Sequence, residues 1–519
     1  MAAPSEKLAR SLESLKALQG HGVVAIRSSD LERIDRERLV KNGFLQPVMK
    51  GWYIPSRPDE IAGESTAWYA SFWNFCASYL NARFSTAWCL SPEQSLLLHA
   101  GNRTVPCQLL VRSPKGDNKI TELPHGTSLL TVRYSMPDRQ DIEAVKGLRL
   151  YALITALIDC SPGLFQQNPT DIRTALSTIS DASEILAKLL EGGHTTIAGR
   201  LAGAFRNIGR DRIADDIVAS MRAADYDVRE SDPFETKPPV ILSGRELSPY
   251  VNRLRLMWHA MRKPVIERFP EAPGIPKDIK TYMQNVDDVY VTDAYHSLSI
   301  EGYRVSAELI ERVREQSWNP DDNENDREHR NAMVARGYYQ AFQAVKESVT
   351  KVLKNENPGI IADNDHSTWY RGLFAPSITA GILDIADLAG YRNGPVYIRY
   401  SQHTPPNRDA VRDLMPALFD LIKKEPNPAV RVVLGHFMFV YIHPYMDGNG
   451  RMGRFLMNVM LASGGYPWTV VPLERRDEYM AALEEASVGQ NIVPFSDFLA
   501  GLVNAGLEGK PVPAIPSSK

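Results

Sequence analysis

The stretch from His443 to Arg454, HPYMDGNGRMGR, separates two strongly apolar segments. The apolar run 432–442 predicts a helix buried on most sides, and Pro444 forbids its simple continuation. A second helical pattern occupies 451–461, and the glycine pair 464–465 ends it. The quoted stretch is therefore predicted to be a loop that joins two core helices and lies at the N-terminus of the second.

This position suits a phosphate chain. Gly448 and Gly450 permit tight backbone conformations that aim successive N–H groups into one concavity. The free amides and the dipole of the following helix add positive potential there. Arg451 and Arg454, three residues apart, project on one side of the first helical turn, where forked guanidinium groups can hold a polyphosphate.

The remaining polar residues of the stretch supply chemistry. Asp447 offers a hard carboxylate oxygen, the kind of ligand that Mg²⁺ takes beside phosphates. The Asn449 amide can donate to a phosphate oxygen, and His443 can accept a proton near neutral pH. A plain glycine turn with a satisfied histidine and solvated arginines would account for each residue singly. It does not account for all of them within a dozen positions.

The stretch resembles the Fic motif, HPFx(D/E)GNGRxxR, and differs from it only by Tyr445 in place of Phe. The similarity extends to AGYRNGPVYIRYSQHTPPNRDAVRDLM (389–415), which resembles the flap region of the family. RRDEYMAALEEA (475–486) and PFSDFLAGLV (494–503) are similar to the helices that follow the motif. In all, the resemblance covers roughly 248–503, about half of the chain.

The resemblance implies a protein adenylyltransferase that moves AMP from ATP-Mg²⁺ to a Ser, Thr or Tyr hydroxyl of a target protein or of itself. His443 would be the catalytic base and Asp447 the metal ligand. The nucleotide would be bound by an anion nest and two arginines: Gly448, Asn449, Gly450, Arg451 for the β-phosphate and Arg454 for the γ-phosphate. Transfer of another nucleotide or phosphoryl group stays open, because such a nest recognises phosphate groups better than it recognises the nucleobase.

A short hairpin is predicted near 391–400. By resemblance this flap would dock an extended target segment by strand addition, which gives register with little sequence selectivity. Its docking residues would be Tyr391, Arg392, Val396 and Ile398. The alternative is an ordinary surface hairpin.

Upstream, SLSIEG (297–302) resembles the inhibitory motif (S/T)xxxE(G/N) of Fic proteins, with Ser297, Glu301 and Gly302 at its defining positions. Glu301 would pair with Arg454 and withhold that arginine from the γ-phosphate. Two alternatives remain: Glu301 is a surface carboxylate before a glycine C-cap, or it orients a water for removal of AMP from a modified protein.

The first 62 residues predict a winged helix: a helix over 6–18, a short helix around Leu31, a third over 36–41, and a hairpin over 45–55. LVKNGFLQPVMKGWYIPSR (39–57) resembles the N-terminal module of AbiEi-type antitoxins. Contacts to double-stranded DNA would come from basic residues on the third helix and the wing: Arg36, Arg38, Lys41 and Lys50. Nearby acidic residues dilute this patch, so a protein-contact module is the alternative.

Residues 63–228 predict a mixed α/β domain, weakly similar to the second AbiEi domain, with helices over 67–80, 92–100, 147–159 and 182–224 and strands over 108–112 and 128–133. A linker over 229–249, a helical Fic domain over 250–508 and a disordered tail over 509–519 complete the prediction. The fold class is mainly α. A regulator that binds DNA and uses its Fic domain as a nucleotide sensor is the rival function.

The composition is that of a soluble globular protein: 519 residues, 44% of them hydrophobic, and a net charge of −3. Such a charge gives no global attraction to nucleic acid or to an acidic membrane. No apolar run approaches the ~20 residues of a membrane helix, and the start of the chain lacks a secretory h-region. Four scattered cysteines predict neither a disulfide framework nor a zinc site. We therefore expect a cytoplasmic protein, with a homo-oligomer left open.

Overall fold

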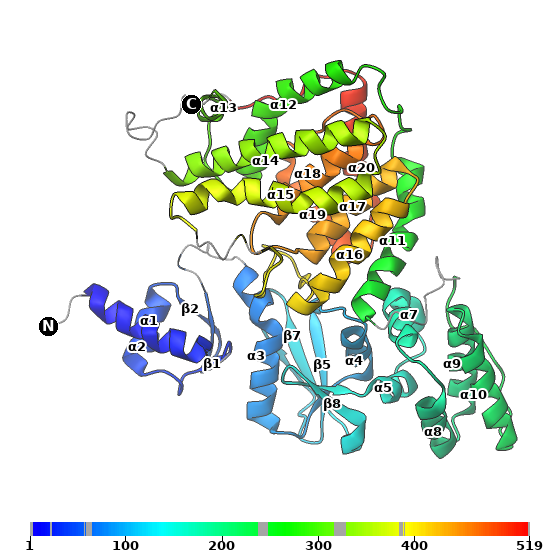
Figure 1. Cartoon of the computed structure of the whole chain (residues 1–519). Coiled ribbons are helices and arrows are strands. Elements are labelled where there is room, and N and C mark those ends of the chain that lie inside the picture. Colours follow the sequence, from blue (N-terminus) through cyan, green and yellow to red (C-terminus); the bar gives the residue numbers. More distant parts are fainter. Residues whose placement is uncertain are drawn as a thin grey trace. The chain divides into compact units, whose positions relative to one another are not determined.

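The computed structural model describes residues 4–20, 23–56, 58, 65–236, 248–315, 329–383, 388 and 390–516 (Figure 1). The chain forms two compact units. The first comprises 1–253 and 396–404, and the second comprises 254–395 and 405–519. The C-terminal unit is helical throughout its regular structure, and the N-terminal unit mixes helices and strands. A mainly α chain with a mixed α/β N-terminal region is thereby confirmed. No helix in the described part of the chain is long and apolar enough to cross a membrane.

The N-terminal module consists of α1 (Pro4–Gly20), β1 (Ile26–Arg27), α2 (Arg33–Lys41), β2 (Leu45–Met49) and β3 (Trp52–Pro55). Its three strands form an antiparallel sheet in the order β1-β3-β2, so the predicted hairpin is present. The predicted short helix around Leu31 is wrong. Residues 28–32 turn instead, because the Asp30 carboxylate accepts the Arg27 N–H at 2.7 Å and Ser28 N–H bonds the Gly51 carbonyl.

This module is not a self-contained core. Leu15, Ile26 and Leu39 pack in one small cluster with other residues of the module. Trp52 and Ile54 instead join the cluster built on α3 (Thr66–Phe84), where the Trp52 ring meets Phe75 edge-on. The two predicted modules of the N-terminal half therefore share hydrophobic core, and the boundary at 62/63 stays a prediction.

Two of the four candidate DNA-binding side chains are engaged within the module. The Arg38 guanidinium donates to Ser11 Oγ at 2.6 Å and to Asp35 Oδ1 at 3.1 Å. Arg36 donates to the Ser28 carbonyl and lies over the Tyr53 ring. Lys41 and Lys50 are exposed. Phosphate contacts by Arg38 would require its ion pair to open, and DNA binding stays a prediction.

The middle of the N-terminal unit holds a four-stranded sheet in the order β4-β5-β7-β6, with β5 and β7 parallel. The predicted strands 108–112 and 128–133 are β5 and β7. The prediction of one helix over 147–159 is wrong in its first half, because Leu148 and Leu150 alternate inward on a strand and only 153–159 are helical. The elements are β4 (Cys89–Leu90), α4 (Pro92–His99), β5 (Gln108–Ser113), β6 (Lys119–Glu122), β7 (Ser128–Arg133), β8 (Ile142–Val145), β9 (Leu148–Tyr151) and α5 (Leu153–Asp159).

Short helices complete the unit: α6 (Leu164–Gln167), α7 (Pro169–Ser177), α8 (Ser183–Gly192), α9 (Thr195–Asn207) and α10 (Asp211–Ala223). The start of the predicted linker packs against α9. A Cβ on Gly199 would lie 2.0 Å from the Arg229 carbonyl oxygen, so glycine permits this close approach. Phe234 is buried. Residues 229–236 therefore belong to the N-terminal unit, and 237–247 lie outside the described residues.

The C-terminal unit is built from α11 (Pro249–Arg268, whose first turn lies in the N-terminal unit), α12 (Ile279–Ile300), α13 (Ala307–Arg314), α14 (His329–Leu353), α15 (Pro358–Thr379), α16 (Arg408–Lys424), α17 (Pro428–Ile442), α18 (Asn449–Ala462), α19 (Arg476–Ser487) and α20 (Val493–Leu507). α14 and α15 run side by side (Figure 1). α17 and α18 are the predicted core pair, and nearly every side chain of both is buried. Residues 510–516 have no regular secondary structure, and the last three residues lie outside the described part.

Candidate functional site

The stretch 443–454 joins α17 to α18 through a turn fixed by two left-handed residues. His443 caps the C-terminus of α17 at φ 53°, and Gly448 caps the N-terminus of α18 at φ 80°. A Cβ on Gly448 would also lie 2.9 Å from the Phe374 ring, so both conformation and space favour glycine there. The predicted loop between two core helices is present at the predicted position.

Arg392 secures the first end of the loop. Its Nε donates to the His443 carbonyl at 2.7 Å, and its other nitrogens reach the carbonyls of Gly394, Pro406 and Ile442. Its backbone N–H donates to the Pro444 carbonyl at 2.9 Å. These carbonyls include the last ones of α17, which lack partners inside the helix and attract a cation. Arg392 thus holds the backbone from which the His443 side chain projects.

Asn449 secures the second end. Its Oδ1 accepts the Tyr445 N–H and its Nδ2 donates to the Tyr445 carbonyl, both at 2.9 Å. The side chain is buried and both of its polar atoms are engaged with one backbone unit. The amide nitrogen carries a second hydrogen, so donation from this side chain to a phosphate oxygen stays a prediction. Its backbone N–H lies at the start of α18 and is a further candidate donor for an anion.

His443 presents its basic nitrogen away from the helix. Nδ1 lies 3.2 Å from the Val440 carbonyl, which can only accept, so Nδ1 carries the proton and Nε2 the lone pair. Burial lowers the pKa of His443 to about 4, and the Arg392 charge adds to this effect while the Val440 carbonyl opposes it. The imidazole is thus neutral at physiological pH and able to accept a proton at Nε2.

Asp447 projects from the turn into solvent with 62% of its side chain exposed. Its Oδ1 accepts the Gly448 N–H at 2.6 Å, and its Oδ2 lies 3.2 Å from Arg451 NH2 and 3.5 Å from the Tyr303 hydroxyl. A carboxylate oxygen can accept more than one bond. Asp447 therefore retains acceptor capacity for a divalent cation beside the arginine.

Arg451 is a buried cation with unmet donors. Only 1% of its side chain is exposed, and among the described residues it forms an ion pair with Asp447 alone, through NH2. Its Nε and NH1 have no hydrogen-bond partner among the described residues. Leaving charged donors buried and unpaired is costly. We therefore infer that an anion binds the free donors of Arg451, and a phosphate group of a nucleotide fits this arrangement.

Arg454, one turn further along α18, uses its Nε and NH2 in hydrogen bonds within the protein. NH2 donates to Glu301 Oε1 at 2.7 Å, and Nε donates to Ser297 Oγ at 2.9 Å. Burial lowers the pKa of Arg454, but the Glu301 carboxylate together with Tyr479 and Tyr338 outweighs this effect, so the net shift of the pKa is upward. A Cβ on Gly450 would lie 2.3 Å from Glu301 Oε1, so this glycine makes room for the carboxylate.

Residues 374–461 match the family model described as the Fic/DOC family. The C-terminal half of the chain contains a Fic domain. Curated relatives named protein adenylyltransferase Fic include those of Drosophila willistoni (28% identical over 225 residues, 43% of this chain and 41% of the relative) and Nematostella vectensis (28% over 231 residues, 44% and 50%). The chain thus spans about half the length of these relatives or less.

Among solved structures, Fic-1 (residues 134–508) from C. elegans matches with a TM-score of 0.38 and 18% identity, over 66% of this chain and 97% of that one. A Fic family protein from Desulfovibrio desulfuricans matches with a TM-score of 0.34 and 19% identity, over 53% and 77%.

The Fic domain brings most of the predicted site residues together, but not the flap. No strand forms over 391–400, so the predicted hairpin is wrong. Arg392 is buried against the loop, where its side chain and its N–H are used internally, and Tyr391 bonds His366 through its hydroxyl at 2.9 Å. Val396 and Ile398 belong to the N-terminal unit. Target docking through this segment stays a prediction.

Two aromatic residues of the Fic site escaped the sequence-based prediction. The Arg451 guanidinium lies over the Phe374 ring at 5.1 Å and over the Tyr303 ring at 5.3 Å. Phe374 lies on α15, and Tyr303 directly follows the sequence 297–302. Nothing in the spacing of either residue points to Arg451. The one available signal was the position of Tyr303 two residues after Glu301.

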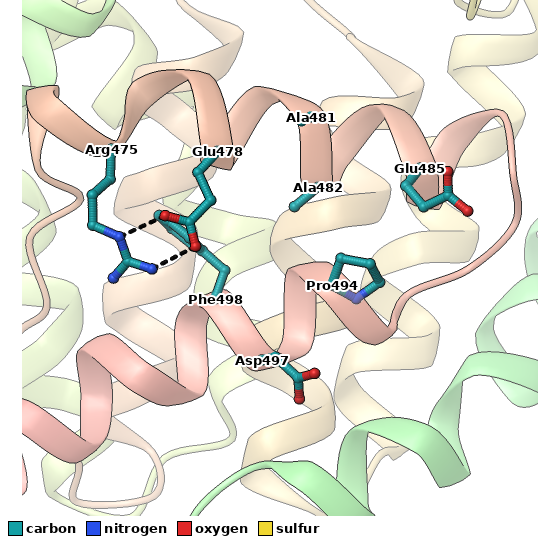
Figure 2. A pocket seen from close by; sticks show the side chains of 8 residues that line it. All are labelled: Arg475, Glu478, Ala481, Ala482, Glu485, Pro494, Asp497 and Phe498. Atoms are coloured by element: carbon teal, nitrogen blue, oxygen red, sulfur yellow. Dashed lines mark hydrogen bonds and ion pairs between the residues drawn. The ribbon is translucent and has the colours of Figure 1, made fainter.

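A surface pocket of about 470 Å³ lies elsewhere, between α19 and α20 (Figure 2). Arg475 and Glu478 form a double hydrogen bond at its edge, and Asp497 is 3.5 Å from Arg268. No residue of the stretch 443–454 lines it. Its lining cation, Arg475, is already paired with Glu478, so the pocket lacks the buried, unpartnered donors that Arg451 shows in the loop 443–454.

Replacing Asn449 by Ala is expected to destabilise the Fic domain. The change leaves the buried N–H and carbonyl of Tyr445 without partners, at roughly 1–3 kcal/mol for each group. Urea unfolding followed by tryptophan fluorescence measures the loss. Asn504→Ala, an exposed position of α20, is the matched control and should be neutral or slightly stabilising. Equal stabilities for the two variants would contradict a structural role for the two hydrogen bonds between Asn449 and the Tyr445 backbone.

Proposed function

We propose that this chain is a protein adenylyltransferase that transfers AMP from ATP-Mg²⁺ to a hydroxyl side chain of a target protein or of itself. The observation that carries the proposal concerns Arg451 in the first turn of α18: its buried Nε and NH1 have no hydrogen-bond partner in the described part of the chain. The neutral His443 lies at the start of the turn that precedes this helix. A phosphate-binding helix start beside a base suits transfer of a phosphorus group to a hydroxyl. The curated relatives named above carry that activity in their names.

His443 performs the proton transfer in this proposal. Its Nε2 takes the proton of the acceptor hydroxyl as that oxygen bonds the α-phosphorus of ATP. The bond between this phosphorus and its bridging oxygen breaks, and pyrophosphate leaves. Arg451 and the backbone amides at the start of α18 hold the phosphates in position. Asp447 would hold Mg²⁺, which when bound offsets negative charge on the phosphates.

The same proposal includes self-inhibition by Glu301. A guanidinium can pair bidentately with one anion at a time. Because Arg454 donates to Glu301 and to Ser297, it is not available to the γ-phosphate in this state. The inhibitory role therefore rests on the ion pair of 2.7 Å between Glu301 and Arg454.

Glu301→Gly is expected to raise labelling of protein by α-³²P-ATP. Freeing Arg454 removes a charge-assisted hydrogen bond worth roughly 1.5–3 kcal/mol, which corresponds to about a 10- to 100-fold gain. Ser297→Ala, which removes only a neutral partner of Arg454, should give a smaller gain. A time course with pre-labelled protein accompanies the assay. If wild type releases AMP and Glu301→Gly does not, Glu301 serves AMP removal, and the inhibitory role is wrong.

His443→Ala, made in the Glu301→Gly background, is expected to lower the labelling rate by about 10²- to 10⁴-fold, the usual contribution of a general base. ATP affinity by calorimetry should stay near that of the background, because binding rests on the nest and the arginines. Labelling within a few-fold of the background would rule out His443 as the base.

The pH dependence of kcat/KM tests the protonation state of the base. Neutral His443 is the active form, so activity should be full above its pKa of about 4 and should fall as the pH drops through that value. An unperturbed histidine would lose activity near pH 6.5. In Glu301→Gly the half-point should not rise, because the Glu301 carboxylate raises the pKa of His443. Circular dichroism at each pH checks folding, and a half-point near pH 6.5 would contradict the assignment.

A further inference from the structure

The Arg451 guanidinium lies over two aromatic rings. Its guanidinium carbon lies 5.3 Å from the centre of the Tyr303 ring and 5.1 Å from that of Phe374. A guanidinium attracts the faces of aromatic rings and stacks on them. Of its in-plane donors, NH2 reaches Asp447, while Nε and NH1 have no partner in the described part of the chain. The two rings therefore restrict the orientation of a guanidinium that still has two donors without a partner among the described residues.

The two rings come from different elements. Phe374 lies within α15 and is buried, so its place is set by the helix packing of the unit. Tyr303 lies outside regular structure, and its place is set by the end of α12. Gly302 adopts φ 87°, its N–H bonds the Ser299 carbonyl at 2.9 Å, and the Tyr303 N–H bonds the Leu298 carbonyl at 3.1 Å. This pair of bonds is the Schellman motif, which fixes the chain just beyond a helix.

One helix end therefore delivers two side chains to two arginines. Glu301 is the C-cap of α12 and pairs with Arg454. Tyr303 follows two residues later and covers Arg451, and its hydroxyl also reaches Asp447 at 3.5 Å. The carboxylate occupies the donors of its arginine. The tyrosine ring lies against its arginine without taking a donor, and Nε and NH1 keep no hydrogen-bond partner among the described residues.

We infer that Tyr303 is a positioning residue for nucleotide binding, whose ring orients Arg451 toward the β-phosphate; this inference rests on the proposed function of the site. The end of α12 then acts on the nucleotide in two opposite ways. Glu301 withholds Arg454, whereas Tyr303 prepares Arg451. Shortening Glu301 is thus expected to strengthen the hold on the nucleotide, whereas shortening Tyr303 is expected to weaken it.

The experiment compares Tyr303→Ala, Tyr303→Leu and Tyr303→Phe, each in the Glu301→Gly background. Loss of the ring should raise KM for ATP by about 3- to 30-fold with a smaller change in kcat, the range expected for a partly desolvated cation–π contact. Tyr303→Phe keeps the ring and should match the background. Tyr295→Ala, a half-buried tyrosine of α12 whose ring lies against His296, is the matched control and should leave KM unchanged.

Binding measured by calorimetry with ADP and with AMP separates this inference from the proposed function. Tyr303→Ala and Tyr303→Leu should weaken ADP, which carries a β-phosphate, and should leave AMP unchanged. If no variant labels protein, the proposed function fails, and ADP binding still tests Tyr303. Leu retains apolar volume, so it serves if Ala prevents folding. Equal ADP affinity in the Leu and Phe variants, or equal weakening by Ala, Leu and Phe, would overturn a role for the ring.

Discussion

The turn between α17 and α18 is the constraint on which the site depends. The chain leaves one buried helix at a left-handed histidine and enters the next at a left-handed glycine, with only 444–447 between them. Both flanking helices are packed on nearly all sides, so the turn cannot relax by shifting either one. Its polar backbone groups must be satisfied locally. Arg392 does this at the His443 end and Asn449 does it at Tyr445, which leaves His443 Nε2 and the start of α18 for chemistry.

Burial of two arginines on one face of α18 creates a demand for anions. A buried guanidinium is stable only when its donors are paired. Arg454 meets this demand inside the protein through Ser297 and Glu301. Arg451 meets it only in part through the exposed Asp447. Arg454 is thus paired with a carboxylate of the protein itself, whereas Arg451 keeps donors that an added anion can satisfy.

The sequence predicted the parts of this site that follow from local chemistry. The glycine positions, the helix start and the spacing of Arg451 and Arg454 are set within a dozen residues, and the Glu301 motif marked a partner 153 positions away. The bonds of Asn449 and Arg392 to the backbone of the turn were not predicted, because an amide or a guanidinium can bind backbone groups as readily as an external ligand. The Tyr303 and Phe374 rings were missed, since aromatic contacts depend on tertiary packing. Secondary-structure predictions failed at β9, which pairs with β8, and over 391–400, where the Arg392 N–H bonds the Pro444 carbonyl and no hairpin forms.

If Glu301 is inhibitory as proposed, the Schellman cap also limits how Glu301 can leave Arg454. Glu301 and Tyr303 are fixed to the same helix end by backbone bonds to Ser299 and Leu298. If α12 withdrew as a whole, Arg454 would be freed, but Arg451 would lose one of the two rings that hold its plane. If only the Glu301 side chain changed rotamer, Arg454 would be freed and the ring would stay in place. Glu301 has 30% of its side chain exposed, so water can receive its carboxylate after such a rotation. In the proposed mechanism, rotation of the Glu301 side chain would thus leave the Tyr303 ring on Arg451, whereas displacement of α12 would free Arg454 but remove that ring.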